Sequence, residues 1–185
     1  TEGLVGSEMC IRDRTNIIES SFEFGVKRLL FLGSSCIYPK FCKQPIKEEY
    51  LLQGSLEKTN EYYAIAKIAG IKLCESLRKQ YGFDAISLMP TNLYGPNDNY
   101  HPTHSHVMAS LIKKFIEAKK MSKSSVTCWG SGNPRREFMH VYDLGRAVLF
   151  ALEHWSPEDN HAPKKESGST LNYLNVGIGE DITIK

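Results

Sequence analysis

The sequence contains no long apolar run and almost no excess of charge of either sign. No apolar run approaches about 18 residues, the length that would indicate a membrane-spanning helix. Lysine and arginine together number 23 and the acidic residues 21, so the net charge is +2. A protein that binds nucleic acid through massed basic residues needs a larger excess of positive charge, so we expect no nucleic acid as a partner. Because no long apolar run is present, we expect no membrane as a partner either. A local group of charges could still bind an anionic small molecule.

Cysteine and histidine lack the spacing of a metal site. The five cysteines are an odd number without ligand-type spacing, and no secretory signal is evident, so we expect reduced thiols in a cytoplasmic protein. Three histidines lie close together but have no acidic or cysteine partner at ligand spacing, so we expect no metal there. A single catalytic imidazole or a structural surface histidine fits them better. These histidines are His101, His104 and His106.

The first stretch of the chain reads as an addition to a natural protein. Residues 4–14 match the in-frame translation of a DNA adapter that is used to prepare sequencing libraries. We therefore expect residues 1–14 to be a non-native leader without function. A genuine but unstructured N-terminus is the alternative. A helical pattern begins at Thr15, and Gly25 is the expected stop.

The pattern that follows is typical of an α/β protein. Two apolar runs, residues 28–33 and 85–90, predict strands that are buried on both faces, as in a parallel sheet. A helical pattern over residues 59–81 lies between them, after an irregular loop. This alternation predicts a doubly wound parallel sheet. Small residues on the helix, among them Gly70, predict close packing by another helix or by a ligand.

Two hydroxyls and a thiol follow the first strand, as Ser34, Ser35 and Cys36. In open α/β sheets ligands bind outside the carboxyl ends of the strands, so these side chains stand where chemistry would occur. A polar turn without function explains the pattern equally well.

Later elements are predicted from residue 105 onward. Ser105 is expected to cap a helix over residues 106–119, with His106 in its first turn. The lysines of this region are most simply a solvated helix face. We further expect a strand at residues 126–130, a helix at 142–155, a strand at 174–177 and a turn into another helix at 181–185.

Tyr63 and Lys67 are four residues apart on the helix of residues 59–81, which places them on one face. A phenol has a pKa near 10, so it is a poor proton donor or acceptor at neutral pH. An ammonium about 4 Å away, at an effective dielectric constant near 20, would stabilise the phenolate by roughly 4 kcal/mol. The pair can therefore serve as an acid in carbonyl reduction. The spacing by itself is common, and an exposed tyrosine beside a solvated lysine is the simpler interpretation.

Taken together, several stretches resemble the extended short-chain dehydrogenase/reductases. Within that family they are most similar to the enzymes that epimerise and reduce GDP-4-keto-6-deoxymannose. The similarity runs from about residue 15 to residue 185, and the Ser-Ser-Cys loop with a later histidine is its most specific part. The stretches are residues 33–39, 63–70, 89–96, 104–107, 129–132 and 136–138.

The resemblance implies an incomplete Rossmann-type doubly wound parallel sheet with part of a small substrate-binding domain. Residues 15–95 and 138–180 would belong to the NADP-binding domain, residues 96–137 to the substrate-binding domain, and residues 181–185 to the start of a next element. The family carries a G-x-x-G-x-x-G phosphate-binding turn in its first βα unit, and this chain has none. We therefore expect the chain as written to be inactive.

The resemblance also assigns roles to five residues. Cys36 would act as the base that removes protons beside the keto group, and His106 would return them. Tyr63 would protonate the oxygen at C4 during reduction, with Lys67 lowering its pKa. Ser34 would hydrogen-bond the same oxygen.

Binding residues follow by the same resemblance. The cofactor is NADP(H), with Lys67 at its ribose, and the substrate is a GDP-4-keto-6-deoxy-mannose. Cofactor contacts are expected from Leu32, Gly33, Ser34, Ser35, Lys67, Pro90, Thr91, Asn92, Leu93 and His106. The GDP-sugar would be held by Lys114, Trp129 and Arg136. From its chemistry alone Arg136 can clamp a phosphate through two hydrogen bonds, whereas Trp129 could equally pack in a core.

A homodimer is expected through the helix that starts near Thr15 and the helix of Tyr63. Two alternatives remain: another NAD(P)-dependent nucleotide-sugar epimerase or dehydratase, and a non-catalytic member of the same fold. Cys36 and His106 discriminate against the first alternative. The presence of Tyr63 and Lys67 speaks against the second.

Overall fold

The computed structural model describes residues 2–102 and 104–185, with side chains from residue 11 onward. The chain divides into two compact units, and each is described by itself. Unit 1 comprises Thr1–Thr91 and Gly145–Val176, and unit 2 comprises Asn92–Leu144 and Gly177–Lys185. The division therefore falls a few residues away from the expected boundaries near residues 95 and 138.

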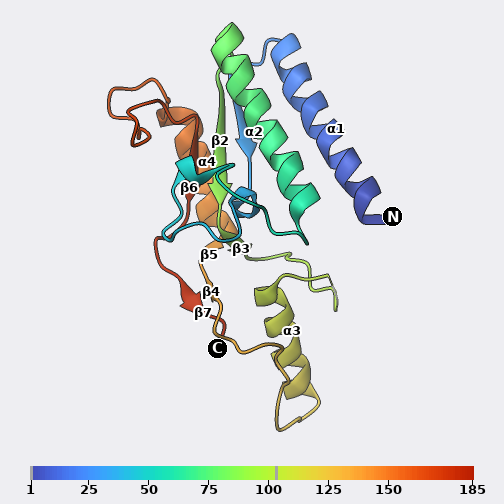
Figure 1. The fold of residues 1–185 in the computed structure, drawn as a ribbon. Helices are drawn as coiled ribbons and strands as arrows, with labels where there is room; N and C mark the ends of the chain where they lie inside the picture. Colours follow the sequence, from blue (N-terminus) through green and yellow to red (C-terminus); the bar gives the residue numbers. More distant parts are fainter. Residues whose placement is uncertain (1, 103) are drawn as a thin grey trace. The chain divides into compact units, whose positions relative to one another are not determined.

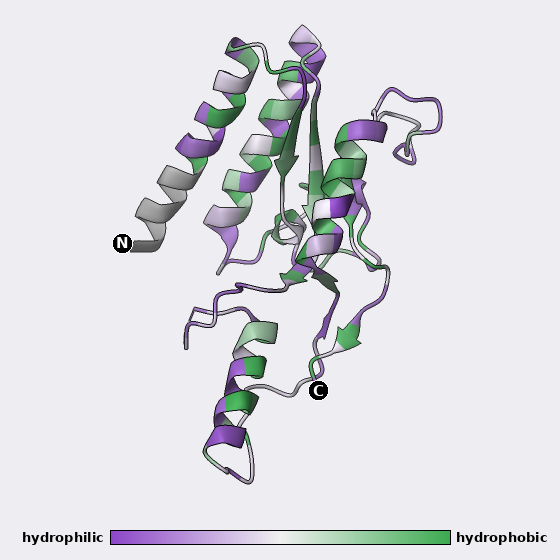
Figure 2. Ribbon diagram, turned by 180° about the vertical axis from the view of Figure 1, so that it is seen from behind, coloured by the Kyte–Doolittle hydropathy of each residue, from purple (hydrophilic) through white to green (hydrophobic). Residues whose placement is uncertain are grey.

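Unit 1 is built on a three-stranded parallel sheet in the order β1-β2-β6 (Figure 1). Its strands are β1 (Leu29–Leu32), β2 (Ala85–Pro90) and β6 (Tyr173–Val176). Every residue of the central strand β2 is buried, because neighbours cover both of its edges and both of its faces. The predicted parallel α/β sheet is confirmed, and the apolar colouring of its strands is visible in Figure 2.

Helices cover both faces of this sheet. α1 (Glu2–Glu23) and α2 (Glu61–Tyr81) lie side by side on one face (Figure 1). α4 (Val141–His154) contributes its residues from Gly145 onward to unit 1. Alternate residues of β2 point to opposite faces, so Met89 packs with α2 residues, and Ile86 packs with Ala151 of α4.

The predicted start of the first helix was wrong. The apolar pattern placed it at Thr15, but α1 begins at Glu2 and continues through the supposed leader. Of the apolar residues in the pattern, Ile18 is buried against Cys74 and Leu77 of α2, whereas Ile17 is 62% exposed. The non-native origin of residues 1–14 stays a prediction.

Two short 3-10 turns interrupt the segment between β1 and α2. η1 (Ser35–Ile37) follows the first strand, and η2 (Glu48–Tyr50) lies inside the loop that was expected to be irregular. Both turns pack with the core beside β2 and β6 and so fix the loop at the carboxyl end of the sheet.

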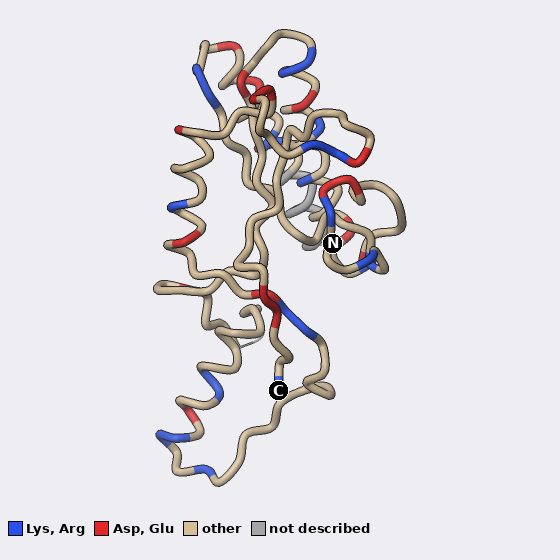
Figure 3. Tube along the Cα trace, turned by 90° about the vertical axis from the view of Figure 1, so that its left-hand side faces the viewer, with Lys and Arg blue, Asp and Glu red and all other residues tan. Residues whose placement is uncertain are grey.

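Unit 2 contains one helix and two pairs of short strands. The helix is α3 (Val107–Lys120). β3 (Asn92–Tyr94) pairs in parallel with β5 (Phe138–His140), and β4 (Arg135–Arg136) pairs antiparallel with β7 (Ile182–Thr183). The basic residues of α3 are interspersed with an acidic one (Figure 3), as in a solvated helix face.

Three predictions for unit 2 were wrong. The stretch 126–130 forms no strand, because almost all of it is exposed and no neighbouring strand pairs with it in the described chain. Residues 181–185 include a short strand, β7, which pairs with β4, where a turn was expected. Ser105 is not the helix cap: His106 occupies that position, and α3 begins at Val107.

Candidate active site

Gly33 brings the chain from β1 into the first turn. A Cβ atom at this position would lie 2.1 Å from the sulfur of the buried Met89, so only a glycine fits beside β2. The Gly33 amide donates to the carbonyl of Leu88 at 2.8 Å. This contact ties the beginning of the turn to the central strand.

The turn presents Cys36 at the surface between buried residues. Ser34 is its N-cap, with extended backbone, and its hydroxyl oxygen accepts from the Cys36 amide at 3.3 Å. Cys36 is exposed, while Ile37 and Tyr38, which follow directly, are 0% and 5% exposed. Burial of these two apolar side chains therefore holds the thiol at the carboxyl end of β1.

The other cysteines have different surroundings. Burial raises the pKa of Cys74 to about 12, so this thiol remains protonated at neutral pH. Burial also raises the pKa of Cys42. Cys128 is exposed but lies in unit 2, on the stretch without secondary structure. Among the unit 1 cysteines whose side chains the structure describes, Cys36 is thus the exposed thiol at a strand end.

Tyr63 and Lys67 lie on the outward face of α2. The helix turns Ala64 and Ala66 inward, where both are buried, and leaves Tyr63 40% exposed. The Lys67 ammonium donates to the carbonyl of Leu32 at 2.6 Å and lies 5.8 Å from the centre of the Tyr63 ring. The pair therefore stands at the same carboxyl end of β1 as Ser34 and Cys36.

Phe31 supports this lysine, and the sequence analysis did not identify it. Its ring centre lies 5.3 Å from the Lys67 nitrogen. The same ring packs against Gly70, where an added Cβ would come within 2.5 Å of it. The small residues of the helix had predicted a close approach by a helix or a ligand, and the approaching group is this strand residue. The small residues of the helix thus indicated a close contact, but they could not indicate which residue makes it.

The end of β2 adds a polar atom without a partner. Pro90 is buried, and the Thr91 amide donates to the carbonyl of Val176 at 3.1 Å. The Thr91 hydroxyl is buried and makes no hydrogen bond among the described residues. A buried hydroxyl without a partner costs about 1–3 kcal/mol. Together with the exposed Leu32 and the Lys67 ammonium, it fits a polar ligand at this edge of the sheet.

The predicted substrate residues lie in unit 2, and two of them meet. The Lys114 ammonium lies 4.5 Å from the centre of the Trp129 ring, a cation–π contact. Trp129 is 84% exposed, so the alternative that it packs in a core was wrong. The guanidinium of Arg136 donates only within its strand, to the carbonyl of Arg135 at 2.8 Å, whereas Arg135 itself is paired with Asp181.

The remaining predicted residues also belong to unit 2. Asn92 and Leu93 form part of β3, and the Asn92 amide group donates to the carbonyl of Glu137 at 3.0 Å. His106 is exposed at the N-terminus of α3, where its carbonyl accepts from the Ser110 amide at 2.9 Å. Of the five predicted catalytic residues, unit 1 thus holds four and unit 2 holds His106.

Two further searches were made over the described residues. No group of three or more His, Cys, Asp or Glu side chains is arranged to hold a metal ion. No helix in this part of the chain has the length and apolar character needed to span a bilayer.

The parallel sheet of unit 1, with helices on both faces, is an α/β fold of the Rossmann type. The chain belongs to the NAD dependent epimerase/dehydratase family, whose model matches residues 9–162. The predicted family resemblance is confirmed.

Individual proteins that are similar to the chain narrow the comparison within this family. The chain is 55% identical over 172 residues to GDP-L-fucose synthase 1 of Arabidopsis thaliana, which covers 93% of this chain and 49% of the relative. It is 53% identical over 173 residues to GDP-L-fucose synthase of Escherichia coli K12, at 92% and 52% coverage. The chain thus spans about half the length of the curated relatives it matches.

A solved structure supports the fold. A GDP-mannoheptose C4 reductase from Campylobacter jejuni with NADP bound is 36% identical and superposes with a TM-score of 0.82. The match covers 95% of this chain and 55% of that one.

Proposed function

We propose that the chain forms the catalytic part of an NADPH-dependent epimerase–reductase that converts GDP-4-keto-6-deoxy-D-mannose into GDP-L-fucose. The observation that carries the proposal is the group of side chains at the carboxyl end of β1. Lys67 contacts the carbonyl of Leu32, and Ser34 accepts from the amide of Cys36. The names of the Arabidopsis and Escherichia coli relatives support this substrate.

Epimerisation uses the acidity of the carbons beside the keto group. The Cys36 thiolate takes a proton from C3 or C5, and the electron pair of that C–H bond moves onto the C4 oxygen as an enolate. A free thiol has a pKa near 8.5, so a few per cent is thiolate at neutral pH. His106 then donates a proton to the opposite face, the enolate pair forms the new C–H bond, and the configuration is inverted.

Reduction at C4 uses the tyrosine–lysine pair. When bound, NADPH supplies the hydride that C4 receives. Tyr63 donates its phenolic proton to the oxygen as the carbonyl becomes an alcohol, and the nearby Lys67 ammonium favours the phenolate that remains. The Ser34 hydroxyl donates a hydrogen bond to the same oxygen and stabilises its developing negative charge.

The chain's contacts with the cofactor and the nucleotide divide between the units. In unit 1, the segment from Leu32 to Ser35, Lys67, Pro90 and Thr91 would contact the nicotinamide and its ribose, and the Thr91 hydroxyl would gain the partner it lacks. In unit 2, Asn92, Leu93 and His106 are the proposed cofactor contacts. Lys114, Trp129 and Arg136 would hold the GDP, the arginine as a fork on a phosphate.

The proposed enzyme is a cytoplasmic homodimer. Exposed apolar side chains on the outer faces of α1 and α2, such as Ile17 at 62% and Ile65 at 44%, support an interface formed by these helices. Light scattering on the purified protein measures its mass, and a monomer at micromolar concentration would contradict this part of the proposal.

The 185-residue chain alone is proposed to be inactive. It contains no G-x-x-G-x-x-G turn, so the backbone amides that would hold the cofactor pyrophosphate are missing from it. Titration with NADPH followed by fluorescence tests this directly. Tight binding by the isolated chain would contradict it.

The function is tested with the complete reading frame of the gene that contains this sequence, called the parent protein below. We expect the parent protein to oxidise NADPH when given GDP-4-keto-6-deoxymannose and to release GDP-L-fucose. Turnover of a different nucleotide sugar in its place would identify another epimerase or dehydratase. No turnover with any of them would identify a non-catalytic protein of the same fold.

A further inference from the structure

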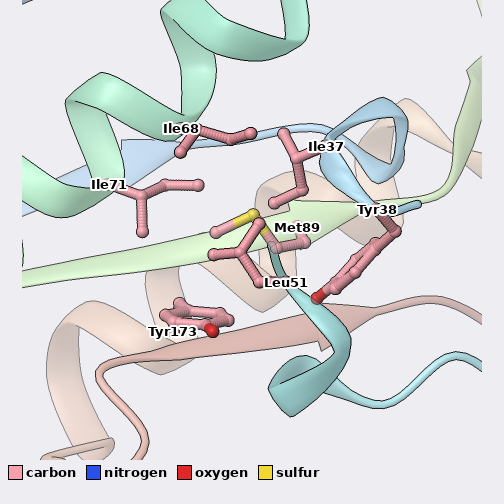
Figure 4. Packing of buried hydrophobic residues seen from close by; sticks show 7 residues of the cluster. All are labelled: Ile37, Tyr38, Leu51, Ile68, Ile71, Met89 and Tyr173. Atoms are coloured by element: carbon pink, nitrogen blue, oxygen red, sulfur yellow. The ribbon is translucent and has the colours of Figure 1, made fainter. Parts of the chain in front are cut away.

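Tyr38 directly follows the turn that carries Cys36, and the proposed chemistry assigns it no role. Its ring is 5% exposed and packs in a cluster with Ile37, Ile68 and Met89 (Figure 4). Its hydroxyl donates to the side-chain oxygen of Asn175 on β6 at 2.6 Å. The two residues are 137 positions apart in the sequence.

Asn175 connects the turn with two other segments. Its side-chain nitrogen donates to the carbonyl of Ile46 at 2.9 Å, and its backbone amide donates to a carboxylate oxygen of Glu48 at 2.8 Å. One asparagine therefore joins the turn, the loop that leads into η2, and the strand at the edge of the sheet. All three hydrogen bonds are close to the best N–H···O and O–H···O distances.

The hydrogen bonds within the turn itself are longer. The Cys36 amide lies 3.3 Å from the Ser34 hydroxyl, the Ile37 amide 3.3 Å from the Ser34 carbonyl, and the Tyr38 amide 3.4 Å from the Ser35 carbonyl. Bonds of this length are weak. The orientation of Cys36 therefore depends on what holds the residues that follow it: the burial of Ile37 and Tyr38, and the hydrogen bond that fixes the Tyr38 ring to Asn175.

We propose that Tyr38 and Asn175 are positioning residues, which fix the Cys36 thiol at the carboxyl end of the sheet for proton removal. This inference rests on the proposed function. Burial, with the charge of Glu48 adding to it, raises the pKa of Tyr38, so its phenol stays a hydrogen-bond donor. Ser34 depends less on the contact, because the neighbouring Gly33 is bonded to Leu88 of β2.

The test separates the two half-reactions in the parent protein. The Tyr38→Phe variant keeps the ring and removes only the donor. We expect it to incorporate deuterium from heavy water at C3 and C5 at least about tenfold more slowly, because small displacements of a catalytic group have large effects on rate. Reduction of a ketone that is already epimerised should stay within about twofold of the wild type. Asn175→Leu should act in the same direction.

Tyr173→Phe is the matched control. Tyr173 is 2% exposed and belongs to the same cluster. Its hydroxyl donates to the carbonyl of Glu48 at 3.0 Å and not to Asn175. It should lose a comparable amount of thermal stability and retain the exchange rate. At a fixed pH, the rate of alkylation of Cys36 should change in Tyr38→Phe, while that of Cys128 should not.

The outcomes are distinguishable. Equal exchange in Tyr38→Phe and the wild type overturns the positioning role. An equal loss in Tyr173→Phe also overturns it, because loosening of the cluster would then be the cause. If Asn175→Leu does not fold, Tyr38→Phe alone decides. If the wild-type parent protein shows no exchange, the proposed function has failed and the inference fails with it.

Discussion

The two ends of the unit 1 sheet are built in different ways. At the amino end, the side chain of Arg78 is 11% exposed and donates to the carbonyl of Ala85 at 3.1 Å and to Glu158 at 2.7 Å, and it also pairs with Asp84. Arg28 lies 3.1 Å from the same Asp84 carboxylate and donates to the carbonyl of Leu152 at 2.8 Å. Both arginines are held mainly by neighbouring groups of the protein, although the buried Nε of Arg28 and the indole nitrogen of the adjacent Trp155 make no hydrogen bond among the described residues.

The carboxyl end places its polar groups at the surface. Cys36 is exposed, whereas Lys67 is half-buried, and its ammonium donates to the backbone carbonyl of Leu32. Thr91 has a hydroxyl without a partner among the described residues. The groups at the amino end of the strands therefore mainly stabilise the fold, whereas those at the carboxyl end are placed for chemistry. Changes of the exposed groups at the carboxyl end should alter activity with little change in stability, and changes of the arginines at the amino end should do the reverse.

Cys36→Ser should give the largest effect at the carboxyl end. A serine hydroxyl is a far weaker base than a thiolate, so epimerisation in the parent protein should fall by about 10³-fold. Reduction of the pre-epimerised ketone should be spared, which NADPH consumption with each ketone measures. Cys128→Ser, a second exposed thiol, is the control and should change neither rate. An equal loss of both steps in Cys36→Ser would count against its role as the base.

Tyr63→Phe should affect the other half-reaction. Removing the phenolic proton donor should slow reduction by about 10²-fold or more while C3 and C5 exchange continues. Tyr62→Phe is the matched control, since Tyr62 precedes it on the same helix and is 53% exposed compared with 40% for Tyr63. Single-turnover reduction rates decide the question. Similar rates in the two variants would show that Tyr63 is not the acid.

Arg78→Leu should break the amino end. It leaves Glu158 without its arginine, Asp84 with Arg28 alone and the Ala85 carbonyl without its side-chain donor, and we expect a loss of about 2–3 kcal/mol in the free energy of unfolding. Arg135→Leu removes an ion pair with Asp181 whose side chains are 57% and 51% exposed, so it should cost clearly less than Arg78→Leu. Denaturant unfolding of the parent protein compares them. A large loss of kcat in a folded Arg78→Leu protein would break the division between the two ends.

The smallest predicted effect depends on pH. Burial acts to raise the pKa of Glu158, but hydrogen bonds from Ser156 and Arg78 outweigh it and hold that pKa below its ordinary value of 4.5. A carboxyl with a lowered pKa in the folded state stabilises the protein above the unfolded pKa, and this contribution is lost as the pH falls through the folded pKa.

Glu158→Gln tests this dependence on pH. The free energy of unfolding of the Glu158→Gln variant should be lower than that of the wild type by under about 1 kcal/mol at pH 7. This difference should disappear below about pH 4, where Glu158 of the wild type is protonated as well. Glu57 and Glu166 also have lowered pKa values, through hydrogen bonds from Lys40 and Lys47. Both residues are present in the wild type and in the Glu158→Gln variant, so their contributions cancel in the difference between the two. A difference that stays constant with pH would contradict the pairing.

The sequence predicted the elements whose apolar pattern is long and regular. Residues 85–90 were predicted as a buried strand and form β2 over those same residues. The helix predicted from residue 59 begins at Glu61, and its Tyr63 and Lys67 lie where the spacing placed them. Such elements are specified locally, by burial on both faces or by a helical repeat.

The helix predicted over residues 106–119 forms as α3 (Val107–Lys120), but the short strands of unit 2 could not be predicted in this way. Strands of two or three residues, such as β4 and β7, contain no periodicity, and they form because a distant segment pairs with them. The stretch 126–130 shows the converse, since its β-branched and aromatic residues found no partner. The contact between Tyr38 and Asn175 likewise joins distant segments and leaves no local signal.

Deuterium exchange in the absence of NADPH tests the central claim most directly. The parent protein is incubated in heavy water with GDP-4-keto-6-deoxymannose, and C3 and C5 are followed by NMR. Deuterium should enter both positions with the wild type and should not enter with Cys36→Ser, because that thiol removes the protons. Exchange that is equal in the two proteins, or absent from the wild type, would contradict an epimerase centre at the carboxyl end of β1.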